Sequence, residues 1–174
     1  MGYTVADMFN LFQFSEGYSG TEICQLAGIK IPTMHFAKAN DVLTKKTNEQ
    51  MVRQFGENWN SIENLRKYQE KKNIVNDFDG ERMKEIRIRK GGTILVYSEM
   101  LGIGNDRLSN LEKGISKPLN WKEYLKLKAL YKGDLLKESA VKKKNAKYTT
   151  KEFITFKNVG GRWEMGKLIK KEVM

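Results

Sequence analysis

Cysteine and histidine are almost missing from this chain of 174 residues, which contains one of each, Cys24 and His35. A single cysteine excludes an intrachain disulfide and fits a protein of a reducing cytoplasm. The two residues also cannot supply a zinc site of the Cys/His type, so we expect no metal. We predict that Cys24 is a small core residue rather than a nucleophile, since the pattern places no histidine near it.

Long apolar runs are absent as well. No run approaches the ~18 residues needed to cross a bilayer, and the first residues lack the basic region and cleavage site of a signal peptide. The sequence also shows no acidic metal-binding cluster, histidine pair or activated nucleophile, which disfavours a nuclease or recombinase. We therefore expect no catalytic residues, no enzymatic activity and no cofactor.

Acidic residues are outnumbered by basic ones. Lys and Arg total 32 against 21 Asp and Glu, which gives a formal net charge of +11. A surplus of this size predicts a polyanionic partner, either nucleic acid or an anionic membrane surface. With 40% hydrophobic and 30% charged residues, the chain has the composition of a folded globular protein.

Glycines divide residues 80–136 into short helices. The stretch GERMKEIRIRKGG predicts a helix that ends at the glycine pair, with Met83, Ile86 and Ile88 on or near its inner side. Thr93 then caps ILVYSEML, Gly102 makes a sharp turn, and NDRLSNLEK forms the next helix. The residues expected to join these two helices are Leu101, Ile103, Leu108 and Leu111.

A further helix, WKEYLKLKALY, opens with Asn120 and Glu123 spaced as a capping pair. We expect its apolar residues to close the core of this part of the chain. These residues are Trp121, Tyr124, Leu125 and Leu127.

Two short helices joined by a sharp turn are typical of a helix-turn-helix, whose second helix lies in the major groove. Here the second helix carries polar outward residues that can read base edges. Asn pairs with adenine, Arg favours guanine, and Asp accepts from cytosine N4. The predicted DNA contacts of this helix are Asn105, Asp106, Arg107, Ser109, Asn110 and Lys113.

Residues 80–136 resemble the Xre (Cro/CI) family of repressor DNA-binding domains. The matching stretches are ERMKEIRIRKGGT, LGIGNDRLSNLEKGISKP and YLKLKALY. The resemblance implies a buried ion pair between Arg87 and Glu112, and a small residue, Ser98, where the two helices approach each other. Ile94 stands where the family usually has a Gln that contacts a phosphate. An Xre-type domain used only for protein contacts is the alternative.

The stretch SGTEICQLAGIKIPTMHFAKANDVL repeats this plan nearer the amino terminus. Ser19 or Gly20 would cap a helix over residues 21–27, Gly28 takes the turn, and Pro32 suits the start of the next helix. An apolar helix, TVADMFNLFQF, precedes this pair, and helices over TNEQMVRQF and NSIENLRKYQEKK follow it. A helical scaffold whose turn resembles the motif by chance is the alternative.

An alignment of the two turn glycines brings small or apolar residues together wherever packing requires them. It matches Cys24 with Ser98, Met34 with Leu108, and Ala37 with Leu111. On the outward face, Thr33 and Phe36 suit thymine methyl groups and lysines suit phosphates, while His35 alone fits an ordinary surface histidine better than a ligand. The predicted DNA contacts of this helix are Lys30, Thr33, His35, Phe36 and Lys38.

The composition changes after Leu136. Residues 137–151 contain six lysines and one acid, Glu138, which indicates an exposed basic linker that either touches phosphates or is only a tether. EFITFK then alternates like a strand, NVGG is a turn, and RWEMGKLIKKEV predicts a short helix. One strand and one helix cannot form a core alone, so they must pack on identical copies or on the preceding domain. The predicted oligomerisation residues are Phe153, Ile154, Phe156, Trp163, Met165, Leu168 and Ile169.

This tail resembles the strand–turn–helix tetramerisation domain of the animal tumour-suppressor transcription factor, over roughly residues 148–172. The resemblance implies a homotetramer in which strands pair into dimers and helices pack two dimers together. Three glycines depart from that pattern, Gly160, Gly161 and Gly166. The last of them lowers helix propensity by roughly 1 kcal/mol relative to Ala.

Together these patterns predict a mainly α protein with two tandem helix-turn-helix domains, residues 1–75 and 76–136, a basic linker, 137–147, and a β-strand–turn–helix oligomerisation element, 148–174. The arrangement resembles the family of master repressors of conjugation genes on Bacillus plasmids. That resemblance implies a cytoplasmic bacterial repressor of a promoter on double-stranded DNA, with a Rap-type anti-repressor protein as antagonist and no membrane partner. Operator occupancy and DNA looping would be the mechanism.

The main alternative is an accessory DNA-binding factor for recombination or conjugative DNA processing, of the excisionase or relaxosome type. A pure adaptor without DNA binding is disfavoured by the basic charge.

Overall fold

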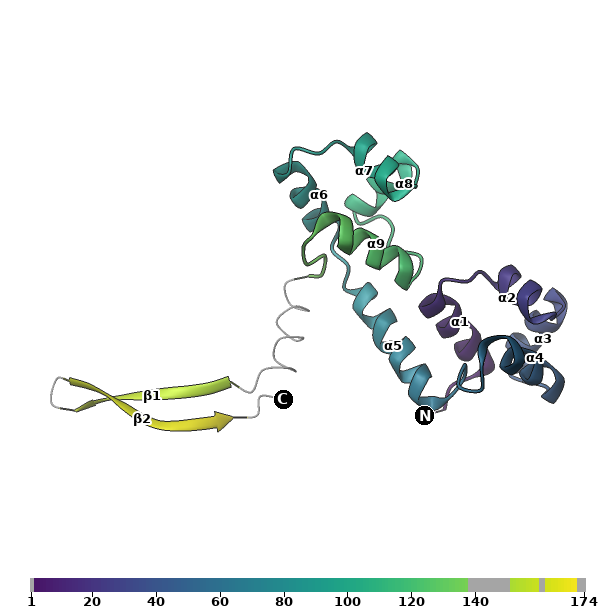
Figure 1. Cartoon of the computed structure of the whole chain (residues 1–174), viewed down its shortest axis with the longest axis horizontal. Coiled ribbons are helices and arrows are strands. Elements are labelled where there is room, and N and C mark those ends of the chain that lie inside the picture. Colours follow the sequence, from purple (N-terminus) through teal and green to yellow (C-terminus); the bar gives the residue numbers. More distant parts are fainter. Residues whose placement is uncertain (1, 138–150, 160–161, 172–174) are drawn as a thin grey trace. The chain divides into compact units, whose positions relative to one another are not determined.

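The structure is a computed structural model that describes residues 2–137 with their side chains, and residues 151–159 and 162–171 as backbone. The chain divides into two compact units, residues 1–136 and 137–174. The described part of the first unit is helical (Figure 1). Its helices are α1 (Val5–Glu16), α2 (Gly20–Ala27), α3 (Ile31–Asn40), α4 (Lys45–Phe55), α5 (Ile62–Asn76), α6 (Gly80–Arg89), α7 (Ile94–Leu101), α8 (Asn105–Glu112) and α9 (Trp121–Tyr131).

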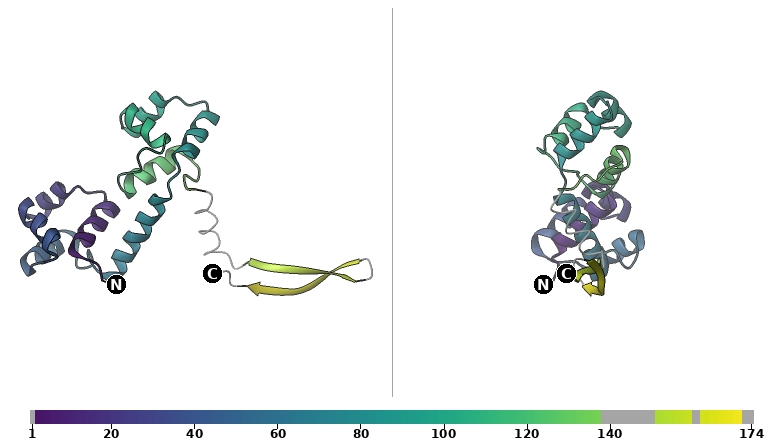
Figure 2. Two further views of the ribbon diagram at one scale, coloured as in Figure 1. Left: turned by 180° about the vertical axis from the view of Figure 1, so that it is seen from behind. Right: turned by 90° about the vertical axis from the view of Figure 1, so that its left-hand side faces the viewer.

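These helices form two groups joined by α5. In the first group, α1 packs on α3 and α5, and α2 packs on α3 and α4; in the second, α8 packs on α6 and α7, while α9 packs on α6 and α7. The long α5 runs from one group to the other, where its end meets α9 (Figures 1 and 2). None of the helices in the described part of the chain is long and apolar enough to cross a membrane.

Helix ends follow the capping residues that the sequence predicts. The Ser19 hydroxyl accepts from the Glu22 backbone N–H while the Glu22 carboxylate accepts from the Ser19 N–H, so α2 starts with a capping box. Thr93 caps α7 and Asn120 caps α9, each through a side-chain oxygen that accepts from the backbone N–H of the third residue of the helix. The helix boundaries predicted for residues 19–136 are therefore confirmed to within about two residues, except that α5 continues to Asn76, beyond the predicted stretch NSIENLRKYQEKK.

An aromatic cluster forms the core of the first group. Phe9 and Phe12 of α1 lie against Trp59, with ring centroids 5.2 and 5.9 Å apart. Met51 of α4 and Leu65 of α5 are buried around them. Burial of this many large apolar side chains, each worth roughly 1.5–3 kcal/mol, is what holds these short helices together.

The core of the second group is only partly the one predicted. Met83, Tyr124 and Leu127 are buried as expected, and so are both central leucines of α8. Ile88 and Leu125 are exposed, so the prediction that they pack inward is wrong. Each lies on a helix with a narrow buried face, and the 3.6-residue period places both on the opposite side.

A buried ion pair joins α6 to α8, as the family resemblance implied. Arg87 Nε lies 2.6 Å from Glu112 Oε1 and Arg87 Nη2 lies 2.7 Å from Glu112 Oε2, while Nη1 donates to the Gly92 carbonyl at 2.8 Å. The two residues are 7% and 2% exposed. Tyr131 of α9 also donates its hydroxyl to Glu112 Oε1 at 3.1 Å, and burial beside this carboxylate raises the pKa of Tyr131.

A lysine cluster fastens the second group to α1 and α5. Lys71 of α5 donates to Ser15 Oγ at 2.6 Å, and its ammonium lies 5.6 Å from the ring of Tyr68 and 5.9 Å from the ring of Trp121. Lys122 lies 5.1 Å from the ring of Tyr18. Cation–π contacts of this kind contribute about 0.5–2 kcal/mol each, so the two groups are held as one unit.

The second unit contains two antiparallel strands, β1 (Lys151–Val159) and β2 (Arg162–Lys171), paired from Lys151 with Lys171 to Val159 with Arg162. The prediction of a helix over RWEMGKLIKKEV is therefore wrong, because residues 162–171 of this stretch form β2. Gly166 weakens a helix, whereas Trp163 and Ile169 favour a strand that has a partner across a short connection. The predicted turn glycines, Gly160 and Gly161, and most of the predicted linker lie outside the described residues.

The strand predicted over EFITFK is part of β1, and all seven predicted oligomerisation residues lie on β1 or β2. The register pairs Phe153 with Ile169 and Ile154 with Leu168, and it shifts before Phe156 pairs with Met165. An isolated two-stranded hairpin is marginally stable in water.

The buried ion pair generates a prediction about stability. Arg87→Met leaves the Glu112 charge buried without its partner, so the free energy of unfolding should fall by about 3–5 kcal/mol. The double variant Arg87→Met/Glu112→Gln removes that charge and keeps an acceptor for Tyr131, so it should recover most of the loss. Urea denaturation of the three proteins measures both effects.

The exposed pair Lys67–Glu63, 2.7 Å apart on α5, supplies the control. Lys67→Met should cost less than about 1 kcal/mol, as exposed ion pairs do. Equal costs for Arg87→Met and Lys67→Met would contradict the structural importance of the buried pair.

Candidate nucleic-acid interface

The turn between α7 and α8 is built by Gly102, whose φ of 67° lies in the left-handed region that glycine favours. The N–H of Ile103 donates to the Ser98 carbonyl at 3.1 Å, which closes the end of α7. Ser98 is buried, and its small side chain lets the two helices approach closely. This turn places the first residues of α8, Asn105 and Asp106, at the surface.

The turn between α2 and α3 has the same construction. Gly28 has a φ of 68°, and the N–H of Ile29 donates to the Cys24 carbonyl at 2.9 Å. Pro32 lies in the first turn of α3, where its missing N–H costs nothing. All six residues matched by the sequence alignment are buried, which confirms the packing it predicts: Cys24 and Ser98, Met34 and Leu108, Ala37 and Leu111.

The predicted contact residues of α8 differ in their exposure and in their hydrogen bonds. Asn105, Asp106 and Lys113 are exposed, while Ser109 and Asn110 are half-buried at the edge of the helix. Asn105 Oδ1 accepts a hydrogen bond from Ser98 Oγ, which orients its amide and leaves the amide nitrogen as a donor. The open part of this surface therefore consists of amides, a carboxylate, a hydroxyl and one ammonium group.

Arg107 is held inside this surface. Its Nη2 donates to Glu123 Oε2 at 3.0 Å and to the Lys117 carbonyl at 2.8 Å. Glu123 also accepts from the Leu119 N–H. Arg107 thus fastens α8 to the loop before α9, and its guanidinium would have to leave these acceptors to reach a base.

The predicted contact residues of α3 also divide into two kinds. Lys30, Thr33, His35 and Phe36 are exposed. Lys38 is half-buried and donates to Asn10 Oδ1 at 2.9 Å and to Gln13 Oε1 at 3.2 Å, two residues of α1. Burial lowers the pKa of Lys38. Its structural role is to fasten α3 to α1.

Sequence reasoning missed Ile31. It occupies the first position of α3, is 45% exposed, and corresponds to Asn105 in the alignment of the two turns. The alignment itself contained this signal, because matching the two glycines matches these two residues as well.

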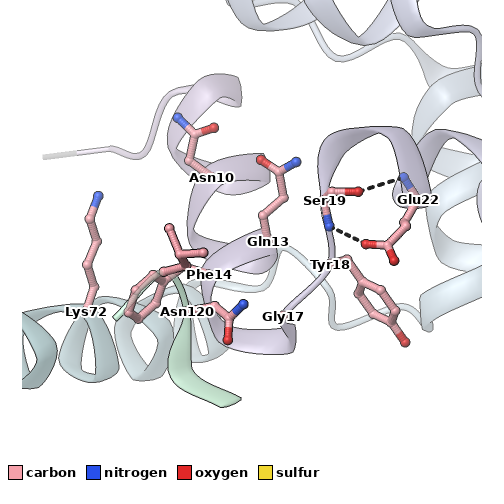
Figure 3. Close-up of a pocket in the computed structure, with 10 residues that line it drawn as sticks. Asn10, Gln13, Phe14, Gly17, Tyr18, Ser19, Glu22, Lys72 and Asn120 are labelled. Carbon is pink, nitrogen blue, oxygen red and sulfur yellow. Dashed lines mark hydrogen bonds between the residues drawn. The ribbon is translucent and has the colours of Figure 1, made fainter. Parts of the chain in front are cut away.

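A hollow of about 540 Å³ lies beside α1, lined by residues of α1, α2, α5 and the loop before α9 (Figure 3). Most of its polar side chains already have hydrogen-bond partners within the fold. Ser19 and Glu22 cap α2 through each other, as the dashed lines show, and Asn10 and Gln13 accept from Lys38. In the described part of the chain, no group of three His, Cys, Asp or Glu side chains is placed to hold a metal ion.

Comparisons of the chain with models of protein families, with curated proteins and with solved structures found no match in any of the three.

The close approach of α2 to α3 generates a prediction about Cys24. Burial raises the pKa of its thiol, so little thiolate forms at neutral pH and reagents cannot reach it. We expect a thiol reagent such as an aromatic disulfide to react with the folded protein at least ~100-fold more slowly than with the protein in denaturant. Rapid labelling of the folded chain, followed by absorbance, would contradict the packing of this helical pair.

Proposed function

We propose that the chain is a sequence-specific DNA-binding repressor in which α2–α3 and α7–α8 are two helix-turn-helix units. The observation that carries this proposal is the repetition of one construction at two sites. Each site has a left-handed glycine, the same backbone hydrogen bond across the turn, and the same three buried positions. Such a pair presents its second helix to the major groove.

The chemistry of α8 supports base reading by this unit. Asn110 can offer a donor and an acceptor to adenine, Asn105 can offer a donor from its amide nitrogen, and Asp106 can accept from cytosine. Lys113 at the end of the helix suits a phosphate. The net charge of +11 would strengthen all of these contacts through the release of counterions from DNA.

The tail supports assembly of several chains. A two-stranded hairpin needs a further surface to be stable, and a second copy of the same hairpin supplies one. A homotetramer would carry eight helix-turn-helix units, and linkage of sites raises avidity by about 10²–10⁴. Two operators held by one tetramer would loop the DNA between them.

The target genes come from the resemblance of the whole chain to conjugation repressors of Bacillus plasmids. We propose a conjugation promoter as the operator, and a Rap-type anti-repressor as the protein that relieves repression. Footprinting on plasmid DNA tests this assignment. Protection of a promoter supports it, whereas protection confined to a transfer origin or attachment site supports an accessory processing factor.

Base reading by α8 generates a prediction. Asn110→Ala should lower affinity for the selected DNA site by about 1–3 kcal/mol, roughly 5- to 150-fold, and leave affinity for random DNA almost unchanged. Mobility-shift titration on both DNAs measures this. Asn73→Ala, which removes an exposed amide of α5, is the matched control and should bind like the unchanged protein.

The salt dependence of binding belongs to the same experiment. Affinity should fall steeply with salt concentration because Lys and Arg side chains displace counterions. An affinity that does not change with salt would contradict the electrostatic part of the proposal.

The tail generates a separate prediction about mass. The full chain should scatter light as a tetramer, and a chain that ends at Lys144, before β1, should have the mass of a monomer or dimer. Equal assembly of both proteins would show that the hairpin is not the oligomerisation element.

A further inference from the structure

The two helical pairs have the same geometry, yet they present different chemistry at matching positions. The buried matches fix the register, so Ile31 corresponds to Asn105 and Phe36 corresponds to Asn110. Asn105 and Asn110 offer amides. Ile31 and Phe36 offer only carbon and hydrogen atoms beyond the backbone.

Ile31 and Phe36 both lie at the surface of α3, where they are 45% and 60% exposed. Ile31 occupies the first position of the helix, and Phe36 lies on the side away from Met34 and Ala37, which are buried. Asn40 Nδ2 donates a hydrogen bond to the Phe36 carbonyl at 2.9 Å. This contact involves the backbone of Phe36 and not its ring. Phe36 is therefore a largely exposed aromatic side chain at the position where its counterpart, Asn110, is an amide.

The charge of this face fits DNA. The sequence of α3, IPTMHFAKAN, contains no acidic residue, and Lys30 is exposed at its N-cap. Asp41, which follows the helix, accepts from the Val5 N–H at 2.6 Å. The positive end of the helix dipole and an ammonium group thus flank the apolar residues, an arrangement suited to a polyanion.

The major groove contains one apolar group that a protein can recognise, the C5 methyl of thymine. Phe36 and Ile31 cannot form the paired hydrogen bonds that distinguish adenine or guanine. We propose that α3 recognises thymine methyl groups through Phe36 and Ile31, so that the two helices of one chain read their half-sites by different chemistry. This inference rests on the proposed DNA binding and specifies what the first unit reads.

The test uses the full-length protein and a DNA site selected by it from a random pool. Footprinting assigns the two half-sites, and each thymine is then replaced singly by deoxyuridine, which keeps the base pair and O4 but lacks the methyl group. Replacement at one or two thymines of the α3 half-site should lower affinity by about fourfold each, the effect of losing one buried methyl contact.

Two variants connect this loss to the proposed residues. Phe36→Ala should weaken binding to the thymine site and abolish the difference between thymine and deoxyuridine. Asn110→Ala is the matched control, since it should weaken binding but preserve that difference. Because the Phe36 ring is mostly exposed, Phe36→Ala should keep the circular dichroism and melting temperature of the unchanged protein.

The outcomes separate the two proposals. A protein that selects no site from the pool overturns the proposed function and this inference with it. A protein that selects a site and is weakened by Asn110→Ala, but binds deoxyuridine and thymine sites equally, overturns only the inference. An intact thymine preference in Phe36→Ala also overturns it, and a change in the mass of the assembly in that variant would make the face a protein contact instead.

Discussion

The second helical group depends on the contact between Arg87 and Glu112. The guanidinium reaches Glu112 of α8 and the Gly92 carbonyl before α7, while the same carboxylate accepts from Tyr131 of α9. This buried ion pair therefore connects α6 to α8, α9 and the loop before α7. The position of α8, and with it the presentation of Asn105 and Asn110, follows from this network, because an unpaired charge at such a site is too costly to tolerate.

The first group reaches the same helical arrangement by other means. Its core is a cluster of aromatic rings around Phe12 and Trp59, and Lys38 occupies the position that matches Glu112. This lysine fastens α3 to amides of α1 rather than to an opposite charge. Two helical pairs with one backbone plan thus differ in what holds the second helix of the pair in place, and they differ again in the side chains that this helix exposes.

Much of this could be predicted from the sequence, because capping residues and turn glycines act locally. Ser19, Thr93 and Asn120 start helices wherever their side chains can accept from the backbone, and the buried matches follow from the helical period. What depends on distant partners could not be predicted from the sequence. The hydrogen bonds of Arg107 to Glu123 and of Lys38 to Asn10 are of this kind, because the acceptors lie on other helices. The tail was expected to contain a helix over RWEMGKLIKKEV. Instead, residues 162–171 form β2, and their backbone groups pair with those of β1.

The lysine contacts between α5, α1 and α9 have a consequence for the DNA site that we propose. A dimer of identical reading domains has a twofold axis, and its operator is palindromic for that reason. Here α5 and the Lys71 contacts join two units of different chemistry within one chain, and such a pair has no twofold axis. In the proposed complex, the DNA sequence that one chain reads is therefore asymmetric and not palindromic. Inversion of that sequence on the duplex reverses the orientation of the bound protein.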